Sequence, residues 1–423
     1  MIPAADAEAL ILNLVTPLSA AHDSETLDLS QVTGRILATE VTSQLDFPHW
    51  DNSAMDGYAV RYEDVQAATE DSPALLEVVT EIPAGTAPQH TIGPGEAARI
   101  LTGSMMPSGA DTVVMQEVTQ RQGNQVKILE APQHGQFVRH RASFYRAGAP
   151  LLRAGIVLNA PEIAVLAAAQ CGQVCVFRRP RVAILSTGSE LVTPDQPLQP
   201  GQIVDSNQYA LTALVQQAGG TALNLGIVPD DPASLRAVIL QAASQADIVL
   251  SSGGVSVGDY DYIDAILSEL GATLHIRAVA VQPGKPLTFA TIPIAERKPT
   301  APSPTLYFGL PGNPVSALVS FWRFVEPAIR KLSGLSHSWQ PLFVQGKAAQ
   351  TLKSGGKRET YIWGHLTQTE AGYEFFAASG SRSSGNLINL TETNALAVVP
   401  IGQTLIAQGE SLRIMQLGRA LQK

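Results

Sequence analysis

The sequence predicts a multidomain fold of the α/β plus β class, built around a central doubly wound α/β domain. Between residues 181 and 332, short apolar runs alternate with longer stretches of helical periodicity, which is typical of a parallel sheet covered by helices on both faces. Residues 41–140 and the region 338–418 instead contain short apolar runs interrupted by Gly and Pro, which predicts β-rich modules. We expect the C-terminal module to be a small barrel or sandwich. The chain has 423 residues, enough for several domains of roughly 100–200 residues each.

Helical spacing of apolar residues occurs on both sides of the first β-rich module. Residues 4–15 have apolar side chains at helical intervals, and Pro17 ends the run. The second stretch is 161–171, with Pro161 in its first turn and Gly172 just beyond its end. We therefore expect one helix before the β-rich module and one after it.

Strands and helices are expected to alternate along the α/β domain. The predicted strands are 182–185, 222–228, 248–250 and 306–308. The predicted helices are 209–218, 232–244, 263–270 and 314–332. Residues 293–304 combine charge and Pro without periodicity, so we expect an exposed loop there. Ligands of such sheets bind at the carboxyl ends of the strands. The polar or glycine-rich loops at those ends are Ser186-Thr187-Gly188, Asp230-Asp231, Ser252-Gly253-Gly254 and Pro311-Gly312-Asn313.

Two stretches indicate chemistry on a phosphorylated substrate. Residues 310–316 run from a predicted strand through a Gly-rich turn into a predicted helix, with Asn313 as a natural N-cap and Pro314 at the first helical position. Backbone N–H groups are free at a helix N-terminus, so such a turn is a ready anion site. Residues 51–59 place two carboxylates and an Asn on a loop, where the carboxylates are available for a metal ion.

Several further motifs each have two interpretations. Asp230-Asp231 precedes a predicted helix, so this pair is either an N-cap or a ligand contact. Residues 186–190 are either a simple turn or a site for a phosphate and a metal. The two acids that follow the glycine-rich turn 253–258 fit a pyrophosphate held by Mg²⁺. Lys285 lies in a turn between two prolines, which favours anion binding. The cations of 353–358 could also bind an anion, but such a run is more often a solvated face.

Composition excludes several classes of function. A net charge of −9 argues against non-specific nucleic-acid binding. No apolar run approaches the roughly 18 residues needed to cross a membrane. Met1 to Leu18 carries two acids and no Lys or Arg, so it is not expected to be a secretory signal.

Cys171 and Cys175 lack a metal or redox spacing, and we expect reduced thiols in a cytoplasmic protein. A Walker-type loop and a GxGxxG motif after a first strand are both missing, which argues against kinases and dehydrogenases.

Seven motifs together closely resemble the molybdopterin molybdenumtransferase family, which includes the E-domain of gephyrin. They are DNSAMDGYA at 51–59, RILTG at 99–103, GADTVV at 109–114, RPRVAILSTG at 179–188, SGGVSVG at 252–258, PGKP at 283–286 and LPGNPVS at 310–316. Each motif alone is modest evidence, but seven in order over almost the whole chain are highly specific.

The resemblance implies a subunit with four parts. These are a discontinuous helical linker domain (1–40 and 145–177), a β-rich inserted domain (41–144), an α/β molybdopterin-binding domain (178–334) and a C-terminal β-barrel-like domain (335–423). It also implies a homodimer whose active-site cleft is shared between the subunits. The implied reaction inserts molybdate into adenylylated molybdopterin, releases AMP and requires Mg²⁺. Transient contact with molybdopterin adenylyltransferase and with molybdoenzyme acceptors is compatible with this role.

Roles are implied for the residues that match family positions. Asp56, Glu190 and Asp261 are implied to bind Mg²⁺ or to position the attacking water, and Thr102 to hydrogen-bond a phosphate. The residues assigned to the pterin–nucleotide ligand are Ser186, Thr187, Gly188, Asp230, Asp231, Ser252, Gly253, Gly254, Ser256, Pro311, Gly312, Asn313 and Pro314. The residues assigned to molybdate are Lys285, Pro286, Arg358 and Ser384, because a constrained Lys and an Arg suit a tetrahedral oxyanion.

The chain departs from the family pattern at three places, which keeps alternative functions open. Ala142-Ser143-Phe144 stands where the family usually has Gly-Glu-Asp, Gln282 replaces a common Lys, and Ser189 replaces a common Asp. A non-catalytic scaffold or molybdopterin-binding protein of the same fold is one alternative. A molybdopterin adenylyltransferase is another, although that activity needs only the α/β domain. Tungstate in place of molybdate is a third, since the two oxyanions are nearly equal in size and charge.

Overall fold

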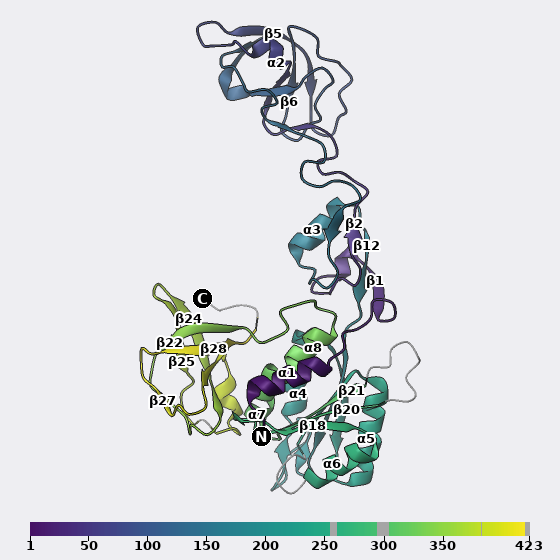
Figure 1. The fold of residues 1–423 in the computed structure, drawn as a ribbon, viewed down its shortest axis with the longest axis vertical. Helices are drawn as coiled ribbons and strands as arrows, with labels where there is room; N and C mark the ends of the chain where they lie inside the picture. Colours follow the sequence, from purple (N-terminus) through teal and green to yellow (C-terminus); the bar gives the residue numbers. More distant parts are fainter. Residues whose placement is uncertain (254–259, 294–303, 382, 419–423) are drawn as a thin grey trace. The chain divides into compact units, whose positions relative to one another are not determined.

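The computed structural model describes residues 1–253, 260–293, 304–381 and 383–418. It divides the chain into two compact units, which are described separately below (Figure 1). The first unit contains Met1–Thr39, Ala154–Ile163 and Gln173–Lys423. The second unit contains Glu40–Arg153 and Ala164–Gly172. Helix α3 (Ala160–Ala168) begins in the first unit and ends in the second.

A six-stranded mixed sheet forms the centre of the first unit, in the order β16-β13-β17-β21-β20-β18. The strands are β13 (Arg181–Thr187), β16 (Thr221–Val228), β17 (Ile248–Ser252), β18 (Thr273–Ala278), β20 (Pro286–Ile292) and β21 (Thr305–Leu310). Neighbours among the first four strands in this order are parallel, as predicted, but β20 and β18 are antiparallel to their neighbours. The prediction of a wholly parallel sheet is therefore wrong at this edge. No helix lies between β18 and β20, and such a short connection suits antiparallel neighbours only.

Helices cover both faces of the sheet, so the predicted doubly wound arrangement is confirmed (Figure 1). One face carries α4 (Asn207–Gln217), α7 (Pro314–Ser320) and α8 (Glu326–Leu332), and the other carries α5 (Pro232–Gln245) and α6 (Tyr260–Glu269). Successive residues of β13 point to opposite faces, with Ile184 in one hydrophobic core and Leu185 in the other. A strand buried on both faces is a continuous apolar run, which is why β13 is recognisable in the sequence.

The N-terminal segment packs onto the α/β part of the first unit. Helix α1 (Ala4–Leu14), predicted from residues 4–15, contributes Ala7 and Ile11 to the same core as α8. Strand β1 (Ser24–Asp28) then pairs antiparallel with β12 (Gln173–Phe177). The short helix η1 (Leu29–Gln31) follows β1.

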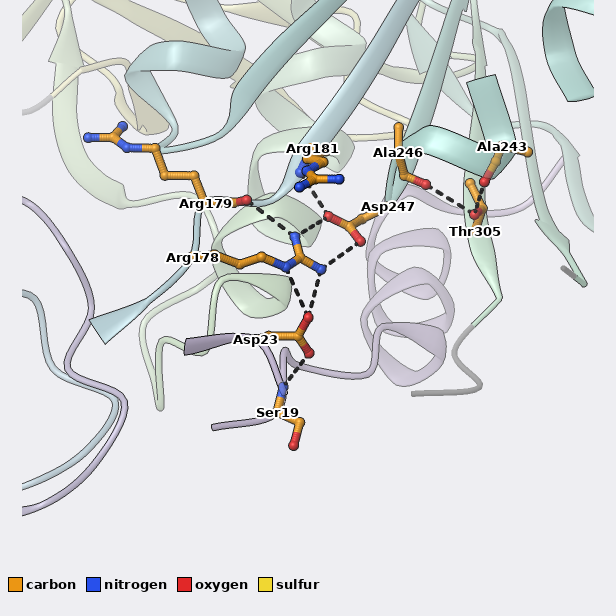
Figure 2. Close-up of polar contacts among 9 residues, drawn as sticks. All are labelled: Ser19, Asp23, Arg178, Arg179, Arg181, Ala243, Ala246, Asp247 and Thr305. Carbon is orange, nitrogen blue, oxygen red and sulfur yellow. Dashed lines mark hydrogen bonds and ion pairs between the residues drawn. The ribbon is translucent and has the colours of Figure 1, made fainter. Parts of the chain in front are cut away.

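Arg178 joins these segments, because its guanidinium lies between the carboxylates of Asp23 and Asp247 (Figure 2). Its Nη1 is 2.8 Å from Asp247 Oδ2, and its Nε is 2.9 Å from Asp23 Oδ1. Asp247 Oδ2 also accepts the backbone N–H of Arg181 at 2.8 Å. The network therefore connects the segment after α1, the residue after β12 and the start of β17. The neighbouring Arg179 side chain points away from it (Figure 2).

The C-terminal part of the first unit is a closed five-stranded β-barrel, one of the two predicted forms. Its strands follow the order β24-β25-β22-β28-β26, and β26 pairs with β24 to close the ring. They are β22 (Phe343–Ala348), β24 (Glu359–Thr369), β25 (Gly372–Ala377), β26 (Ala395–Val399) and β28 (Ser411–Gln416). The remaining elements of this part are β23 (Leu352–Lys353), β27 (Leu405–Ile406) and the short helix η4 (Leu387–Leu390). Strand β19 (Val281–Gln282), between β18 and β20, pairs with β24 and so ties the barrel to the α/β part.

A buried polar network reinforces that connection. Residues 314–332 are predicted as one helix, but a π-helical turn, η3 (Phe321–Val325), separates α7 from α8. Arg323 in this turn is only 3% exposed and pairs with Glu8 of α1. Its Nε donates to the hydroxyl of Tyr361 in β24 at 2.8 Å. The wider turn re-aims side chains relative to an α-helix, and here it directs a charged group to two other parts of the unit.

The second unit is β-rich, as predicted for residues 41–140. Its sheet has the order β7-β4-β6-β5-β9-β8. The strands are β4 (Gly57–Val60), β5 (Ala74–Ile82), β6 (Glu96–Ile100), β7 (Thr112–Met115), β8 (Thr119–Gln122) and β9 (Gln125–Ile128). The shorter elements are β2 (Val41–Thr42), β3 (Asn52–Ser53), α2 (Tyr62–Val65), η2 (Gln116–Val118), β10 (Val138–Arg139) and β11 (Pro150–Leu152). Tyr58 and Ala59 of β4 belong to different hydrophobic cores, one on each face of this sheet.

Within the ranges that the structure describes, none of the helices is both long and apolar enough to span a membrane. Cys171 and Cys175 are free and partly buried.

Candidate active site

The polar loops predicted at the carboxyl ends of the parallel strands lie at one edge of the sheet of the first unit. Ser186 at the end of β13 pairs with Ser252 at the end of β17, which in turn pairs with Leu310 of β21. Gly253 has a φ of +94°, and a Cβ there would lie 2.2 Å from the carbonyl oxygen of Thr187. Only glycine fits this position, so the backbones of two loops come into close contact.

A pocket of about 640 Å³ opens at this edge, and we call it the first pocket. The predicted ligand residues that line it are Ser186, Thr187, Gly188, Glu190, Asp230, Ser252, Gly253, Gly312, Asn313 and Pro314. Its lining also includes residues that were not predicted, namely Asp205, Ser206 and Asn207 at the start of α4, with Gly385 and Leu387 from the C-terminal part. β14 (Leu191–Val192) and β15 (Ile203–Val204) pair beside it. Pro311 and Asp231 are not among the lining residues.

Four residues that line the first pocket have buried polar atoms without a hydrogen-bond partner among the described residues. These atoms are Ser186 Oγ, Thr187 Oγ1, Asp205 Oδ2 and Asn207 Oδ1. Each of these side chains is more than nine-tenths buried. Leaving such an atom unpaired costs about 1–3 kcal/mol, so native structures normally pair it. A bound ligand or ordered water would supply the missing partners.

The carboxylates at the edge of the first pocket have different surroundings. Asp231 caps α5, because its Oδ1 accepts the Ser234 N–H at 3.0 Å, as one of the two predicted interpretations requires. The hydrogen bonds from Ser234, the side-chain one foremost, lower the pKa of Asp231. Asp230 Oδ2 instead accepts the Ser189 N–H at 3.3 Å. Glu190 is exposed and its carboxylate lies close over Gly188, where a Cβ would be 2.8 Å from Glu190 Oε2.

A second pocket of about 470 Å³ is lined by the Pro283–Pro286 turn and by the C-terminal part. It contains the residues predicted to hold molybdate, Lys285, Pro286, Arg358 and Ser384. Lys353 also lines it, although the sequence favoured a solvated face for the 353–358 segment, and so does Gln282. Three cations and no carboxylate are found among its described lining residues, so the second pocket suits an anion.

Two features fix the walls of the second pocket. Arg358 Nη1 donates to the carbonyl oxygen of Val281 at 3.2 Å, which holds the guanidinium beside the turn. Gly284 has a φ of +102°, and a Cβ there would lie 2.7 Å from Ser320 Oγ. The turn that presents Lys285 can therefore pack against α7 only with glycine at this position.

Asn313 belongs to the lining of both pockets. It occupies the predicted N-cap position of α7, with Pro314 at the first helical position. The predicted N-cap position is confirmed, although the side chain of Asn313 makes no capping hydrogen bond. The amide is thus available at the junction between the polar first pocket and the cationic second pocket.

The loop that carries Asp56 is built in the second unit. Asp56 Oδ1 accepts two hydrogen bonds from Thr102, from the backbone N–H at 2.7 Å and from the hydroxyl at 2.8 Å. These bonds, the backbone one foremost, lower the pKa of Asp56. The two residues predicted to act together in catalysis are therefore in direct contact.

The same loop region contains one of the departures from the family pattern. Asp51 Oδ1 accepts the Arg141 N–H at 2.7 Å, and Asp51 Oδ2 lies 3.2 Å from His140 Nδ1. Phe144, which replaces the usual acid, is 73% exposed. Its backbone N–H donates to the carbonyl oxygen of Phe47 at 2.9 Å. The phenyl ring therefore projects from an anchored backbone, and no carboxylate stands at this position.

Three predicted site residues cannot be placed. Gly254 and Ser256 lie outside the described residues, as does most of the predicted loop 293–304. Asp261 falls within α6, but its side chain is also outside the described part of the chain.

Comparison with known proteins covers nearly the whole chain. Residues 2–170 match the MoeA N-terminal region (domain I and II), residues 183–331 a probable molybdopterin binding domain, and residues 345–417 the MoeA C-terminal region (domain IV). A molybdopterin molybdenumtransferase of a Nostoc species is 60% identical over 412 residues, covering 97% of this chain and 93% of the relative. That of Haemophilus influenzae is 34% identical and covers 92% and 93%.

A solved structure of a related protein has a similar fold. The molybdopterin biosynthesis MoeA protein of Pyrococcus horikoshii aligns with a TM-score of 0.82 at 28% identity, covering 98% of this chain and all of that one. The multidomain fold of this chain thus matches that of a solved structure along nearly its whole length. The chain therefore belongs to the molybdopterin molybdenumtransferase (MoeA) family, the enzymes of molybdenum cofactor biosynthesis that insert molybdenum into molybdopterin.

Proposed function

We propose that this enzyme takes adenylylated molybdopterin and molybdate, cleaves the adenylyl group with release of AMP, and uses Mg²⁺. The observation that supports this most is the pair of pockets that meet at Asn313. One is lined by hydroxyls, glycines and carboxylates, and the other by three cations. A large polar ligand and a small oxyanion would thus bind next to each other.

The first pocket is proposed to hold the pterin–nucleotide ligand. Ser186, Thr187 and Ser252 offer hydroxyls, and Gly188, Gly253 and Gly312 let the backbone approach the ligand closely. Asp230 rather than Asp231 is the acid proposed to contact the ligand, because Asp231 is used as a helix cap.

The second pocket is proposed to hold molybdate. Lys285, Lys353 and Arg358 would neutralise the charge of the dianion, and the Ser384 hydroxyl would donate a hydrogen bond to one of its oxygens. Gln282 supplies an amide donor where relatives have a cation. Tungstate would satisfy the same groups.

The donor set at the first pocket fits Mg²⁺. Mg²⁺ takes oxygen ligands and usually binds one or two carboxylates together with substrate phosphates. Glu190 and Asp230 line the pocket and provide such carboxylates. Asp56 and Asp261 are proposed as further ligands by their family positions. When bound, the ion would neutralise charge that develops on the phosphoanhydride.

We further propose a homodimer in which each cleft is built from two subunits. Asp56 and Thr102 lie in the second compact unit, whereas both pockets lie in the first. A cleft that combines the Asp56 loop of one subunit with the pockets of the other would bring these parts together. Delivery of the substrate by an adenylyltransferase, and transfer of the product to acceptor enzymes, would involve transient contacts at the open cleft.

The decisive experiment measures AMP released from adenylylated molybdopterin by the purified protein with Mg²⁺, with and without molybdate. We expect molybdate to stimulate the release. Release should also fall when Mg²⁺ is removed with a chelator and return when it is added back. Tight binding of the ligand without release would instead indicate a binding protein that has lost its chemistry, and would reject the proposal.

A further inference from the structure

Two side chains of the first pocket have oxygen atoms for which the described part of the chain provides no donor. Asp205 and Asn207 are 3% and 7% exposed, and both line the pocket. Asp205 Oδ1 accepts the backbone N–H of Gln208 at 3.2 Å, so this oxygen caps the start of α4. Asp205 Oδ2 and Asn207 Oδ1 are buried and lack a partner among the described residues.

The orientation of the Asn207 amide is fixed by its neighbours. Its Nδ2 donates to Ser252 Oγ at 2.6 Å and to the carbonyl oxygen of Gly312 at 2.9 Å. A backbone carbonyl oxygen can only accept hydrogen bonds, so the NH₂ group of Asn207 must face Gly312. The amide oxygen Oδ1 of Asn207 takes part in neither of these two bonds. An ionised carboxylate is likewise an acceptor only. Asp205 Oδ2 and Asn207 Oδ1, two oxygens of residues that line the first pocket and are here called the acceptor wall, can therefore bind only hydrogen-bond donors.

This pattern selects among the parts of the proposed substrate. A phosphate has only acceptor oxygens near neutral pH, and Asp205 would repel it. The edge of adenine that carries its amino group presents one donor next to one acceptor. The aminopyrimidinone edge of a pterin presents the N3–H and the 2-amino group side by side, which are donors only. Asp205 Oδ2 and Asn207 Oδ1 would each accept one of these two donors, and the hydrogen bond to the carboxylate oxygen would be charge-assisted.

We infer that Asp205, together with Asn207, recognises the aminopyrimidinone edge of the pterin and so determines which end of the substrate enters the first pocket. The inference rests on the proposed function, because it assumes that the pterin occupies this pocket. It assigns the hydroxyls of Ser186 and Thr187, which can donate as well as accept, to other groups of the ligand. The phosphates are thereby directed away from the start of α4.

Two fluorescent ligands test the inference directly. Pterin carries the 2-amino group, whereas lumazine has a carbonyl oxygen at the same position and is otherwise closely matched. Fluorescence titration of the full-length protein with each ligand gives two dissociation constants. We expect pterin to bind at least about tenfold more tightly, because lumazine places an acceptor against the acceptor wall.

The matched variant is Asp205→Asn. Its side-chain oxygen can still cap α4, while its NH₂ group replaces the acceptor with a donor. We expect Asp205→Asn to weaken pterin binding and to narrow or reverse the preference over lumazine. Asp195→Asn, which removes an exposed carboxylate that does not line the pocket, should leave both constants unchanged.

Several results would overturn the inference. Equal affinity of the unmodified protein for pterin and lumazine would do so without any variant, and so would failure of both to bind. An unchanged preference in a folded Asp205→Asn protein would show that Asp205 is only a helix cap. If Asp205→Asn lost Mg²⁺ binding but kept the preference for pterin over lumazine, Asp205 would be a metal ligand and not a pterin contact. Neither ligand carries an adenylyl group, so a protein that discriminates between them but releases no AMP would refute the proposed reaction and not this inference.

Discussion

Asp56 is held by two hydrogen bonds from a single residue, which stabilises its charged form. Both the N–H and the hydroxyl of Thr102 donate to the same carboxylate oxygen. They lower the pKa of Asp56, with a smaller contribution in the same direction from Arg99. A depressed pKa in the folded state keeps the carboxylate ionised throughout the neutral range, which is the form needed to bind a metal ion or to orient water.

Removing one of these bonds should raise the pKa of Asp56. Thr102→Val deletes the hydroxyl and keeps the backbone N–H, so we expect a partial return toward the usual value. Because the folded pKa is depressed, the stabilising effect is present above the unfolded pKa and is lost as the pH falls through the folded one. NMR titration of the Asp56 carboxyl carbon measures the change. An unchanged titration midpoint would mean that the hydroxyl contributes nothing.

The cations of the second pocket should control the affinity for molybdate. Lys285→Ala and Lys353→Ala each remove one charge, and we expect each to raise the molybdate concentration for half-maximal insertion about tenfold. The control is Lys357→Ala, since Lys357 is exposed and does not line the pocket. If Lys353→Ala behaves like this control, Lys353 belongs to the solvated surface.

Single residues show both what the sequence predicts and where it is ambiguous. Lys285 is predictable because two prolines constrain its turn. Lys353 is not, because a flexible cationic segment is the same in sequence whether it faces solvent or a pocket. Asp205 and Asn207 escape prediction for a different reason. In the sequence, an Asp-Ser-Asn run at the start of a predicted helix is sufficiently explained as an N-terminal cap. Only the structure shows that Asp205 Oδ2 and Asn207 Oδ1 are buried without a hydrogen-bond partner among the described residues.

At the scale of elements, the Arg178 network connects three segments that are far apart in the sequence. The Arg178 side chain is 28% exposed, and those of Asp23 and Asp247 are 14% and 7% exposed. The two carboxylates of Asp23 and Asp247 would repel each other if the positive charge of Arg178 did not lie between them. The network therefore holds the start of β17 to the segment that follows α1 (Figure 2).

Arg178→Met should destabilise the first unit by about 2–3 kcal/mol, because it leaves two partly buried carboxylates without their cation. This loss of unfolding free energy is at the low end of the range for breaking a buried salt bridge, because the Arg178 guanidinium is partly exposed to water. Denaturant unfolding measures it. Arg179→Met is the matched control, and we expect little change because that side chain points away from the network. Equal stability of both variants would contradict the role given to Arg178.

Elements with local signals are predictable, and elements set by long-range pairing are not. The run of β13 and the proline at the start of α5 identify these elements within one or two residues of their bounds. Strands β18 and β20 escape prediction because no helix follows β18, and their antiparallel pairing depends on partners elsewhere in the sheet. Pro327, which cannot donate a helical hydrogen bond, signals an interruption just after the π-helical turn η3. The contacts of Arg323 with α1 and the barrel are long-range and have no such signal.

At the scale of the whole molecule, the shared cleft can be tested by combining two defective variants at a molybdate concentration that limits the Lys285→Ala protein. Asp56→Asn inactivates the second unit, and Lys285→Ala impairs the second pocket in the first unit. In a purified heterodimer of these two proteins, one cleft would contain only intact parts, so about half of the unmodified activity should return. Differently tagged subunits, co-expressed and purified through both tags, provide the sample.

The opposite result has an equally clear meaning. If each cleft were built within one subunit, every site in the heterodimer would carry one defect and activity would stay low. A monomer in sedimentation analysis would likewise reject the shared cleft. The two single-variant homodimers, measured in parallel, set the baseline.

Because Asn313 lines both pockets, ligands in the two pockets would share one side chain. We therefore expect both substrates to be on the enzyme together, so initial-rate plots at several fixed molybdate concentrations should give intersecting lines. Parallel lines would indicate a ping-pong mechanism, in which a first product leaves before the second substrate binds. That result would contradict simultaneous binding at the two pockets. Replacing that amide should then change the Michaelis constants of both substrates at once.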